Sequence, residues 1–123
     1  MRSSGFTLLE VLVAMAIFAI TLAAASRGAG HAIDSSNELK RRIVADFVAQ
    51  NRLEIQKATH DWLAPGYLAG EETQAGITMI WKEEISDTPN PAFRKAVIEV
   101  YAVDDPAFVL RKLLGFLTSE PPQ

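Results

Sequence analysis

Cysteine is absent from this chain of 123 residues, which excludes disulfide frameworks, cysteine zinc sites and thiol nucleophiles. An excess of basic residues is also missing, because 12 Lys and Arg stand against 15 Asp and Glu and the formal net charge is -3. A protein whose main task is to bind nucleic-acid phosphates has the opposite balance, so we expect no nucleic-acid partner. A chain of this length holds one small domain at most.

Recognisable catalytic and cofactor motifs are missing as well. The chain has no G-x-S-x-G elbow, no phosphate-binding loop and no dinucleotide fingerprint. The histidine of His60-Asp61 has no second metal ligand at helical spacing, and His31 is 29 positions away. Adjacent residues of a strand point to opposite faces, so Glu83 and Glu84 cannot share a site. We therefore expect no enzyme, no metal and no cofactor.

One long apolar run stands near the amino terminus. Residues 6–25 read FTLLEVLVAMAIFAITLAAA, in which Glu10 is the one charged residue. As a helix, 20 residues span roughly 30 Å, the thickness of a hydrocarbon core. A cleaved secretory signal is the competing interpretation, but the run is too long for it and cleavage would have to follow the run. A single membrane anchor over 6–25, with a water-soluble part over 26–123, is the preferred interpretation.

The soluble part begins with a helical pattern. Apolar residues recur at spacings of three and four up to Ile55, and no proline occurs before Pro65. We therefore expect a helix from Thr7 to about His60, with a bend near Gly28 and Gly30. One sheet would cover about 100° of its circumference, yet the apolar residues occupy a wider arc. We expect the surplus residues nearest the anchor to face partner helices; these are Ile33, Leu39 and Ile43.

The rest of the chain has the pattern of short strands. Residues 77–85 and 95–103 alternate with period two, and turn-forming residues follow each of them. A third apolar stretch at 108–118 continues the pattern, although its leucine spacing also allows a helix. Trp81, Tyr101 and Phe93 are better explained as packing of a small sheet than as a stacking platform for nucleic acid. The predicted fold is therefore α+β and pilin-like, with a long amino-terminal helix packed on an antiparallel sheet of about three strands over 77–118.

Glu10 is the residue that needs a functional explanation, because a carboxylate inside an apolar helix costs several kcal/mol, about 2.5 or more on insertion scales. The string Gly5-Phe6-Thr7-Leu8-Leu9-Glu10, after a short leader with Arg2, resembles the type IV pilin-like signal. That resemblance implies that a prepilin peptidase removes residues 1–5, cuts between Gly5 and Phe6, and methylates the new amino group of Phe6. It also implies that Glu10 pairs with the amino-terminal charge of a neighbouring subunit. An interfacial position at headgroup depth is the alternative explanation for Glu10.

The rest of the chain resembles the I-type minor pseudopilin of type II secretion, through residues 49–54 (AQNRLE) and 113–117 (LLGFL). The resemblance implies an inner-membrane protein with a cytoplasmic amino terminus and a periplasmic domain. Its implied partners are the J-type and K-type minor pseudopilins, the major pseudopilin, the prepilin peptidase and the assembly platform. With the J-type and K-type minor pseudopilins it would form a tip complex that starts assembly of a pseudopilus, which exports folded proteins. A minor pilin of a type IV pilus or DNA-uptake filament remains the alternative, and a signal-anchored periplasmic enzyme would need a catalytic constellation that we do not find.

Overall fold

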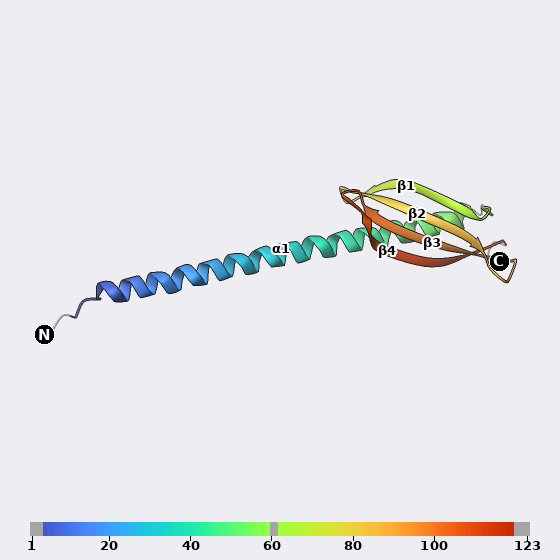
Figure 1. Cartoon of the computed structure of the whole chain (residues 1–123). Coiled ribbons are helices and arrows are strands. Elements are labelled where there is room, and N and C mark those ends of the chain that lie inside the picture. The colour runs from blue at the N-terminus through green and yellow to red at the C-terminus, as the bar shows by residue number, and fades with distance from the viewer. Residues whose placement is uncertain (1–3, 60–61, 120–123) are drawn as a thin grey trace. The chain divides into compact units, whose positions relative to one another are not determined.

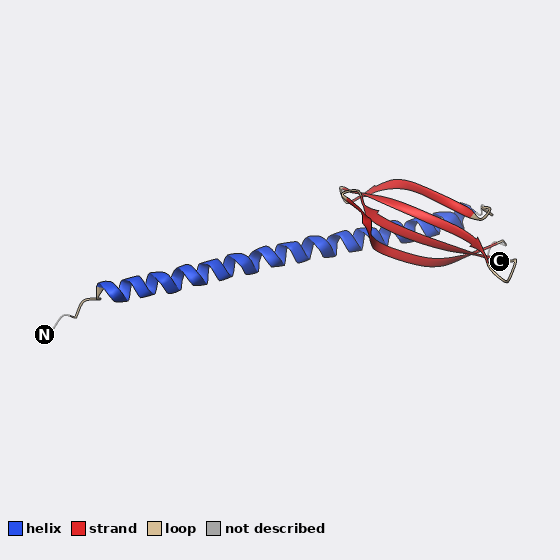
Figure 2. Cartoon of the chain, viewed as in Figure 1, coloured by secondary structure: helices blue, strands red, loops and turns tan. Residues whose placement is uncertain are grey.

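The structure is a computed structural model that describes residues 4–59 and 62–119. These residues form the helix α1 (Leu8–Thr59) and the strands β1 (Gly66–Gln74), β2 (Ile77–Asp87), β3 (Phe93–Ala102) and β4 (Asp105–Thr118), as Figures 1 and 2 show. The chain divides into two compact units, Met1–Glu38 and Leu39–Gln123. The predicted α+β fold with a long amino-terminal helix is confirmed.

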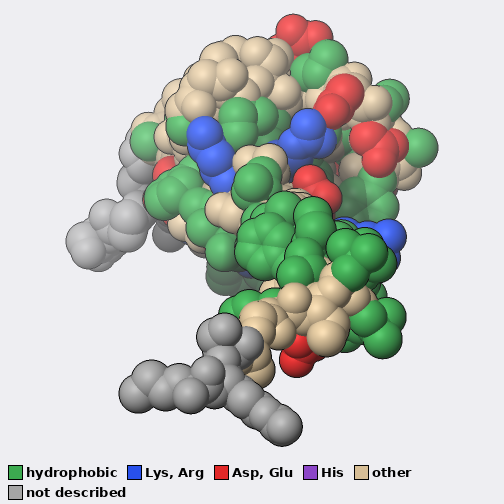
Figure 3. All heavy atoms as spheres, turned by 90° about the vertical axis from the view of Figure 1, so that its left-hand side faces the viewer, with side chains coloured by type: hydrophobic (Ala, Val, Ile, Leu, Met, Phe, Trp, Pro, Cys, Tyr) green, Lys and Arg blue, Asp and Glu red, His purple; other side chains and the backbone are tan. Residues whose placement is uncertain are grey.

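The first unit is helical and apolar. Every side chain of α1 up to Lys40 is exposed, and by length and composition this part of α1 can cross a membrane. Two hydroxyls within it are satisfied locally, because Thr21 donates to the carbonyl of Ile17 (2.8 Å) and Ser26 donates to the carbonyl of Leu22 (2.9 Å). Such local bonds are what a lipid environment requires of polar groups. Hydrophobic side chains dominate the part of α1 nearest the viewer in Figure 3.

The second unit contains an antiparallel sheet with strand order β1-β2-β3-β4. The three predicted strands are present, and residues 108–118 belong to β4, so the helical alternative for them is wrong. The predicted count is also wrong, because β1 adds a fourth strand before residue 77. Its sequence, GYLAGEETQ, has two glycines and adjacent glutamates, which are weak strand formers. Pairing with β2, from Gly66 opposite Ile85 to Gln74 opposite Ile77, holds it as an edge strand.

The core lies between the inner face of the sheet and the second half of α1. The helix contributes Val44, Ala45, Val48, Ala49 and Leu53 to the core cluster, and the sheet contributes Met79, Trp81, Ile85, Ala96, Ile98, Val100 and Leu117. Alternate residues of β2 and β3 are buried, as the period of two requires. A close contact between α1 and the sheet lies at Gly115 of β4, where a Cβ atom would stand 2.6 Å from both Cδ atoms of Leu53.

Two ion pairs also join α1 to the β4 side of the sheet. The guanidinium of Arg41 donates to both carboxylate oxygens of Asp104, at 3.3 and 2.8 Å. The pairing lowers the pKa of Asp104. Five residues further along α1, Asp46 lies 2.7 Å from Nε of Arg111. All four side chains are partly exposed, so these pairs orient the helix more than they stabilise it.

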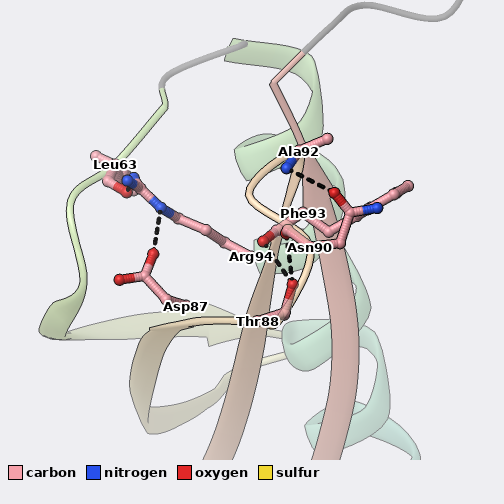
Figure 4. Close-up of polar contacts among 7 residues, drawn as sticks. All are labelled: Leu63, Asp87, Thr88, Asn90, Ala92, Phe93 and Arg94. Atoms are coloured by element: carbon pink, nitrogen blue, oxygen red, sulfur yellow. Dashed lines mark hydrogen bonds and ion pairs between the residues drawn. The ribbon is translucent and has the colours of Figure 1, made fainter.

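Arg94 fixes the connection between α1 and β1 (Figure 4). From β3 its guanidinium donates to the carbonyl of Leu63 and, through Nε, to Asp87 at 3.3 Å. It also lies over the ring of Trp62, 4.3 Å from the centroid. In the neighbouring β2–β3 loop, Thr88 donates to the carbonyl of Phe93 at 2.9 Å. The connection is therefore held by the side chain of Arg94, which reaches it from β3.

Candidate assembly surfaces

Thr7 and Glu10 form a reciprocal cap at the start of α1. The backbone N–H of Thr7 donates to Oε2 of Glu10 at 3.0 Å, and the backbone N–H of Glu10 donates to Oγ1 of Thr7 at 3.1 Å. This is the capping box, in which a threonine before the first helical residue and a glutamate three positions later satisfy each other's backbone. The Thr7 hydroxyl also lies 3.4 Å from the same carboxylate oxygen. The carboxylate therefore has hydrogen-bond donors from its own chain.

The predicted cleavage site lies immediately before this cap. Gly5 and Phe6 precede the helix, and the Phe6 side chain is 88% exposed. A Cβ atom built on Gly5 would meet nothing within 4 Å, so the backbone there is open to approach. The first three leader residues, 1–3, lie outside the described residues. The structure shows only that Gly5 and Phe6 lie next to the start of α1; cleavage between them and the enzyme that acts there stay predictions.

The three residues predicted to meet partner helices are all exposed: Ile33 by 62%, Leu39 by 60% and Ile43 by 48%. Ile33 belongs to the first unit, whereas Leu39 and Ile43 belong to the second. Phe47 follows Ile43 by one helical turn and is also exposed, by 59%. Leu39, Ile43 and Phe47 are spaced by four and therefore lie along one row of the helix surface. The sequence pattern contained Phe47 but did not separate it from the residues of the core.

The acidic pair of β2 divides between the two faces of the sheet, as alternation predicted. Glu83 is completely buried under α1, whereas Glu84 is exposed and accepts a hydrogen bond from the Tyr67 hydroxyl at 3.3 Å. Across the described ranges there is no group of three or more His, Asp or Glu side chains that could hold a metal ion. His60-Asp61, considered above as a metal or base site, lies outside the described residues.

The outer face of the sheet carries a small polar network. The Tyr101 hydroxyl donates to Glu99 at 2.5 Å, and Lys112 of β4 lies 3.1 Å from the same carboxylate. Both contacts lower the pKa of Glu99, and the hydrogen bond from Tyr101 has the larger effect. The hydrogen bond to Glu99 raises the pKa of Tyr101. Trp81 points to the inner face, because it pairs with Val100, the neighbour of Tyr101 along β3. Trp81 and Tyr101 therefore do not form one stacking platform.

Comparison with known proteins adds independent information on both parts of the chain. Residues 39–118 match the family described as type II secretion system (T2SS), protein I. Residues 1–26 match the prokaryotic N-terminal methylation motif.

Individual relatives agree with these matches. The type II secretion system protein I of Pseudomonas aeruginosa is 30% identical over 129 residues, covering 98% of both chains. That of Aeromonas hydrophila is 34% identical over 100 residues, covering 81% of this chain and 84% of the relative. That of Vibrio cholerae is 40% identical over 81 residues, covering 63% of this chain and 65% of the relative.

Proposed function

The chain belongs to the type II secretion system protein I family, and we propose that it acts as a minor pseudopilin in the tip complex that initiates pseudopilus assembly. The family is a structural part of the secretion machinery, and a pseudopilin role requires contacts with other pseudopilins. The observation that carries the proposal is the match of residues 39–118, because the amino-terminal signal alone is shared by pilins of other filaments. That match favours secretion over a type IV pilus or a DNA-uptake filament.

The first step in this proposal is removal of residues 1–5 by a prepilin peptidase and methylation of the Phe6 amino group. The methylation motif covers this region, and the backbone around Gly5 is unobstructed. Cleavage would place a new positive charge on Phe6, directly before Thr7. Because Glu10 already binds the N–H of Thr7, a carboxylate and an ammonium group would then lie at the same end of the helix.

The second step is the pairing of Glu10 with the amino-terminal charge of a neighbouring subunit. In a medium of low dielectric constant such a pair is much stronger than at a surface, although its burial also costs desolvation. Leu39 and Ile43 would extend the contact between subunits along the exposed row of α1, and Ile33 would do so in the first unit. The partners in this proposal are the J-type and K-type minor pseudopilins and the major pseudopilin, with the inner-membrane platform driving assembly.

The apolar part of α1 and the family together fit an anchor in the bacterial inner membrane. We place the amino terminus in the cytoplasm, where the leader is removed, and residues 26–123 in the periplasm. In the assembled state the domain would stand at the tip of the pseudopilus.

Secretion by a deletion strain tests the proposal. A secreted hydrolase is assayed in the medium and in the periplasm after the strain receives the wild-type gene, Glu10→Ala or Glu54→Ala. We expect the enzyme to remain in the periplasm of the deletion strain and of the Glu10→Ala strain. Glu54→Ala removes an exposed carboxylate that pairs with Lys57 three residues away, so it serves as the matched control and should restore secretion.

Mass spectrometry of the purified chain separates assembly from processing. We expect Glu10→Ala to be cleaved before Phe6 and methylated, because the pairing acts after cleavage. An uncut Glu10→Ala precursor would assign Glu10 to recognition by the peptidase instead. Normal secretion in the deletion strain would overturn the secretion function itself.

A further inference from the structure

Glu83 is a charged residue at the centre of the packing between α1 and the sheet. Its side chain is completely buried. On either side within the sheet it pairs with apolar residues, Leu68 of β1 and Ile98 of β3. A buried carboxylate destabilises the fold through the loss of hydrating water unless neighbouring groups donate hydrogen bonds to it. The proposed assembly surfaces do not use this residue, so its presence needs a separate explanation.

Two side chains of α1 reach Glu83, and both reach the same oxygen. Nε2 of Gln56 donates to Oε2 at 3.2 Å, and Nη2 of Arg52 lies 3.8 Å from it. The second oxygen, Oε1, has no hydrogen-bond partner among the residues that the structure describes, and neither has Nε of Arg52. The carboxylate is therefore only half satisfied, and its ion pair is too long for a hydrogen bond.

Arg52 has a second contact that competes with Glu83. Its guanidinium lies over the ring of Trp81, 3.7 Å from the centroid. The same ring covers Gly70 of β1, where a Cβ atom would stand 2.7 Å from it. If Arg52 moves toward Glu83, its contact with Trp81 changes. Because Trp81 packs against Gly70, such a change also affects the edge strand β1.

Other charged groups that the structure describes on this face of the sheet have their own partners, among them Arg111 of β4, which pairs with Asp46 of α1. Glu72 of β1 accepts hydrogen bonds from Asn51 and Gln74, and Arg94 of β3 pairs with Asp87 of β2. Arg52 is thus the charged group of α1 that faces Glu83. Burial raises the pKa of Glu83 above its ordinary value of 4.5, and the opposing effects of Arg52 and then Gln56 are smaller.

We propose that Glu83 is a pH-sensitive latch, in which protonation of the buried carboxyl tightens the packing of α1 on β1 and β2 and ionisation loosens it. The ionised group draws Arg52 toward itself and away from Trp81, whereas the neutral group leaves Arg52 stacked. The stabilisation from protonation is fully present below the ordinary pKa and is lost as the pH rises through the higher pKa of the folded state. A periplasmic domain would in this way respond to mild acid by closing its edge strand onto the core.

Tryptophan fluorescence of the full chain in a non-ionic detergent tests the latch. The chain has two tryptophans, so Trp62→Phe leaves Trp81 as the reporter. Emission is recorded from about pH 4 to about pH 8, the range in which a raised carboxyl pKa falls. We expect a single transition with its midpoint above 4.5, and we expect Arg52→Gln to move the midpoint upward because the cation that lowers the pKa is gone.

Two glutamine variants decide the origin of the transition. Glu83→Gln should abolish it, whereas Glu84→Gln, the neighbouring carboxylate on the opposite face, should leave it in place. A transition that survives Glu83→Gln, or a flat response in the parent, overturns the proposal. Thermal unfolding gives a second readout: Glu83→Gln should raise the unfolding temperature more at pH 8 than at pH 4.5. An equal rise at both pH values would also overturn the proposal.

Discussion

The contact between Leu53 of α1 and Gly115 of β4 makes the packing of helix on sheet open to a quantitative test. Gly115→Ala adds one methyl group at this contact. The new Cβ atom would stand 2.6 Å from Cδ1 and from Cδ2 of Leu53, and 3.2 Å from its Cγ. Carbon atoms in contact prefer about 3.5–4.0 Å, so the Leu53 side chain has to move by about 1 Å or the helix has to lift.

The expected loss of stability follows from two opposing effects. Overpacking of a core costs about 1–3 kcal/mol, whereas replacing glycine by alanine recovers about 0.4–1 kcal/mol from the unfolded chain. The net destabilisation is then about 1–2 kcal/mol, which lowers the unfolding temperature of a small domain by about 5–10 °C. Gly66→Ala is the matched control, because its Cβ atom meets nothing within 4 Å. It gains the same entropic stabilisation of about 0.4–1 kcal/mol without the clash, so it should be slightly more stable than the parent.

Thermal unfolding of the full chain in detergent measures these differences, with every variant made in the Trp62→Phe background so that the fluorescence of the buried Trp81 is followed. Leu53→Ala alone should cost about 2–5 kcal/mol, since Leu53 is only 8% exposed. Combined with Gly115→Ala it should cost less than the sum of the two, by about 1–2 kcal/mol, because the cavity accepts the new methyl group. Strict additivity, or a Gly115→Ala protein as stable as Gly66→Ala, would refute the close contact.

Two further predictions concern polar contacts. Thr7→Ala should destabilise the first turn of α1 by about 0.5–2 kcal/mol, seen as faster amide exchange at residues 8–11, while Thr7→Ser should preserve protection; equal exchange in both variants would contradict the cap. The pKa of Glu99 is lowered mainly by the Tyr101 hydroxyl, so this contact stabilises the domain above the ordinary value of 4.5 and is lost as the pH falls through the folded-state pKa. Tyr101→Phe should therefore lower the unfolding temperature at pH 7 and less so in acid, and a gap that does not narrow would count against it.

Elements with a strong period were predictable from the sequence, and β1 was not. The apolar spacing up to Ile55 predicted α1, and alternation predicted β2 and β3. The edge strand β1 buries little on either face, so it has no period to detect. Its hairpin turn is only half marked: Gly76 has the expected positive φ of 74°, but Ala75 occupies a position with φ of 51° that asparagine, aspartate or glycine usually fills. β1 is a strand because it pairs with β2, and pairing of this kind leaves no pattern in the sequence of the strand itself.

The candidate sites show the same division. Glu10 was identified because it is the one charge in an apolar run. Its cap with Thr7 was missed, although a T-x-x-E spacing before an apolar run is a known sign of a capping box. Glu83 was set aside because it cannot share a site with Glu84 on the opposite face of the strand. Continuing the alternation of Met79 and Trp81 by one step places Glu83 on the buried face, so the signal was present. Its neighbours Arg52 and Gln56 come from another element, and only the packing of α1 brings them there.

The division of the helix surface explains why the wide apolar arc of α1 is not redundant. The sheet takes one side of the helix, on which Ala45, Ala49 and Leu53 succeed one another by four residues and are buried. The row Leu39, Ile43 and Phe47 also advances by four residues. It is offset from the first row by two positions in the sequence, which is about 200° around the helix, and the sheet leaves it uncovered. Ala45 and Ala49 in the first row are small and let the sheet approach closely. The second row consists of large apolar side chains, and their exposure to water indicates a surface for a partner. The row therefore extends the proposed partner surface to Phe47, one turn beyond the residues that the sequence indicated.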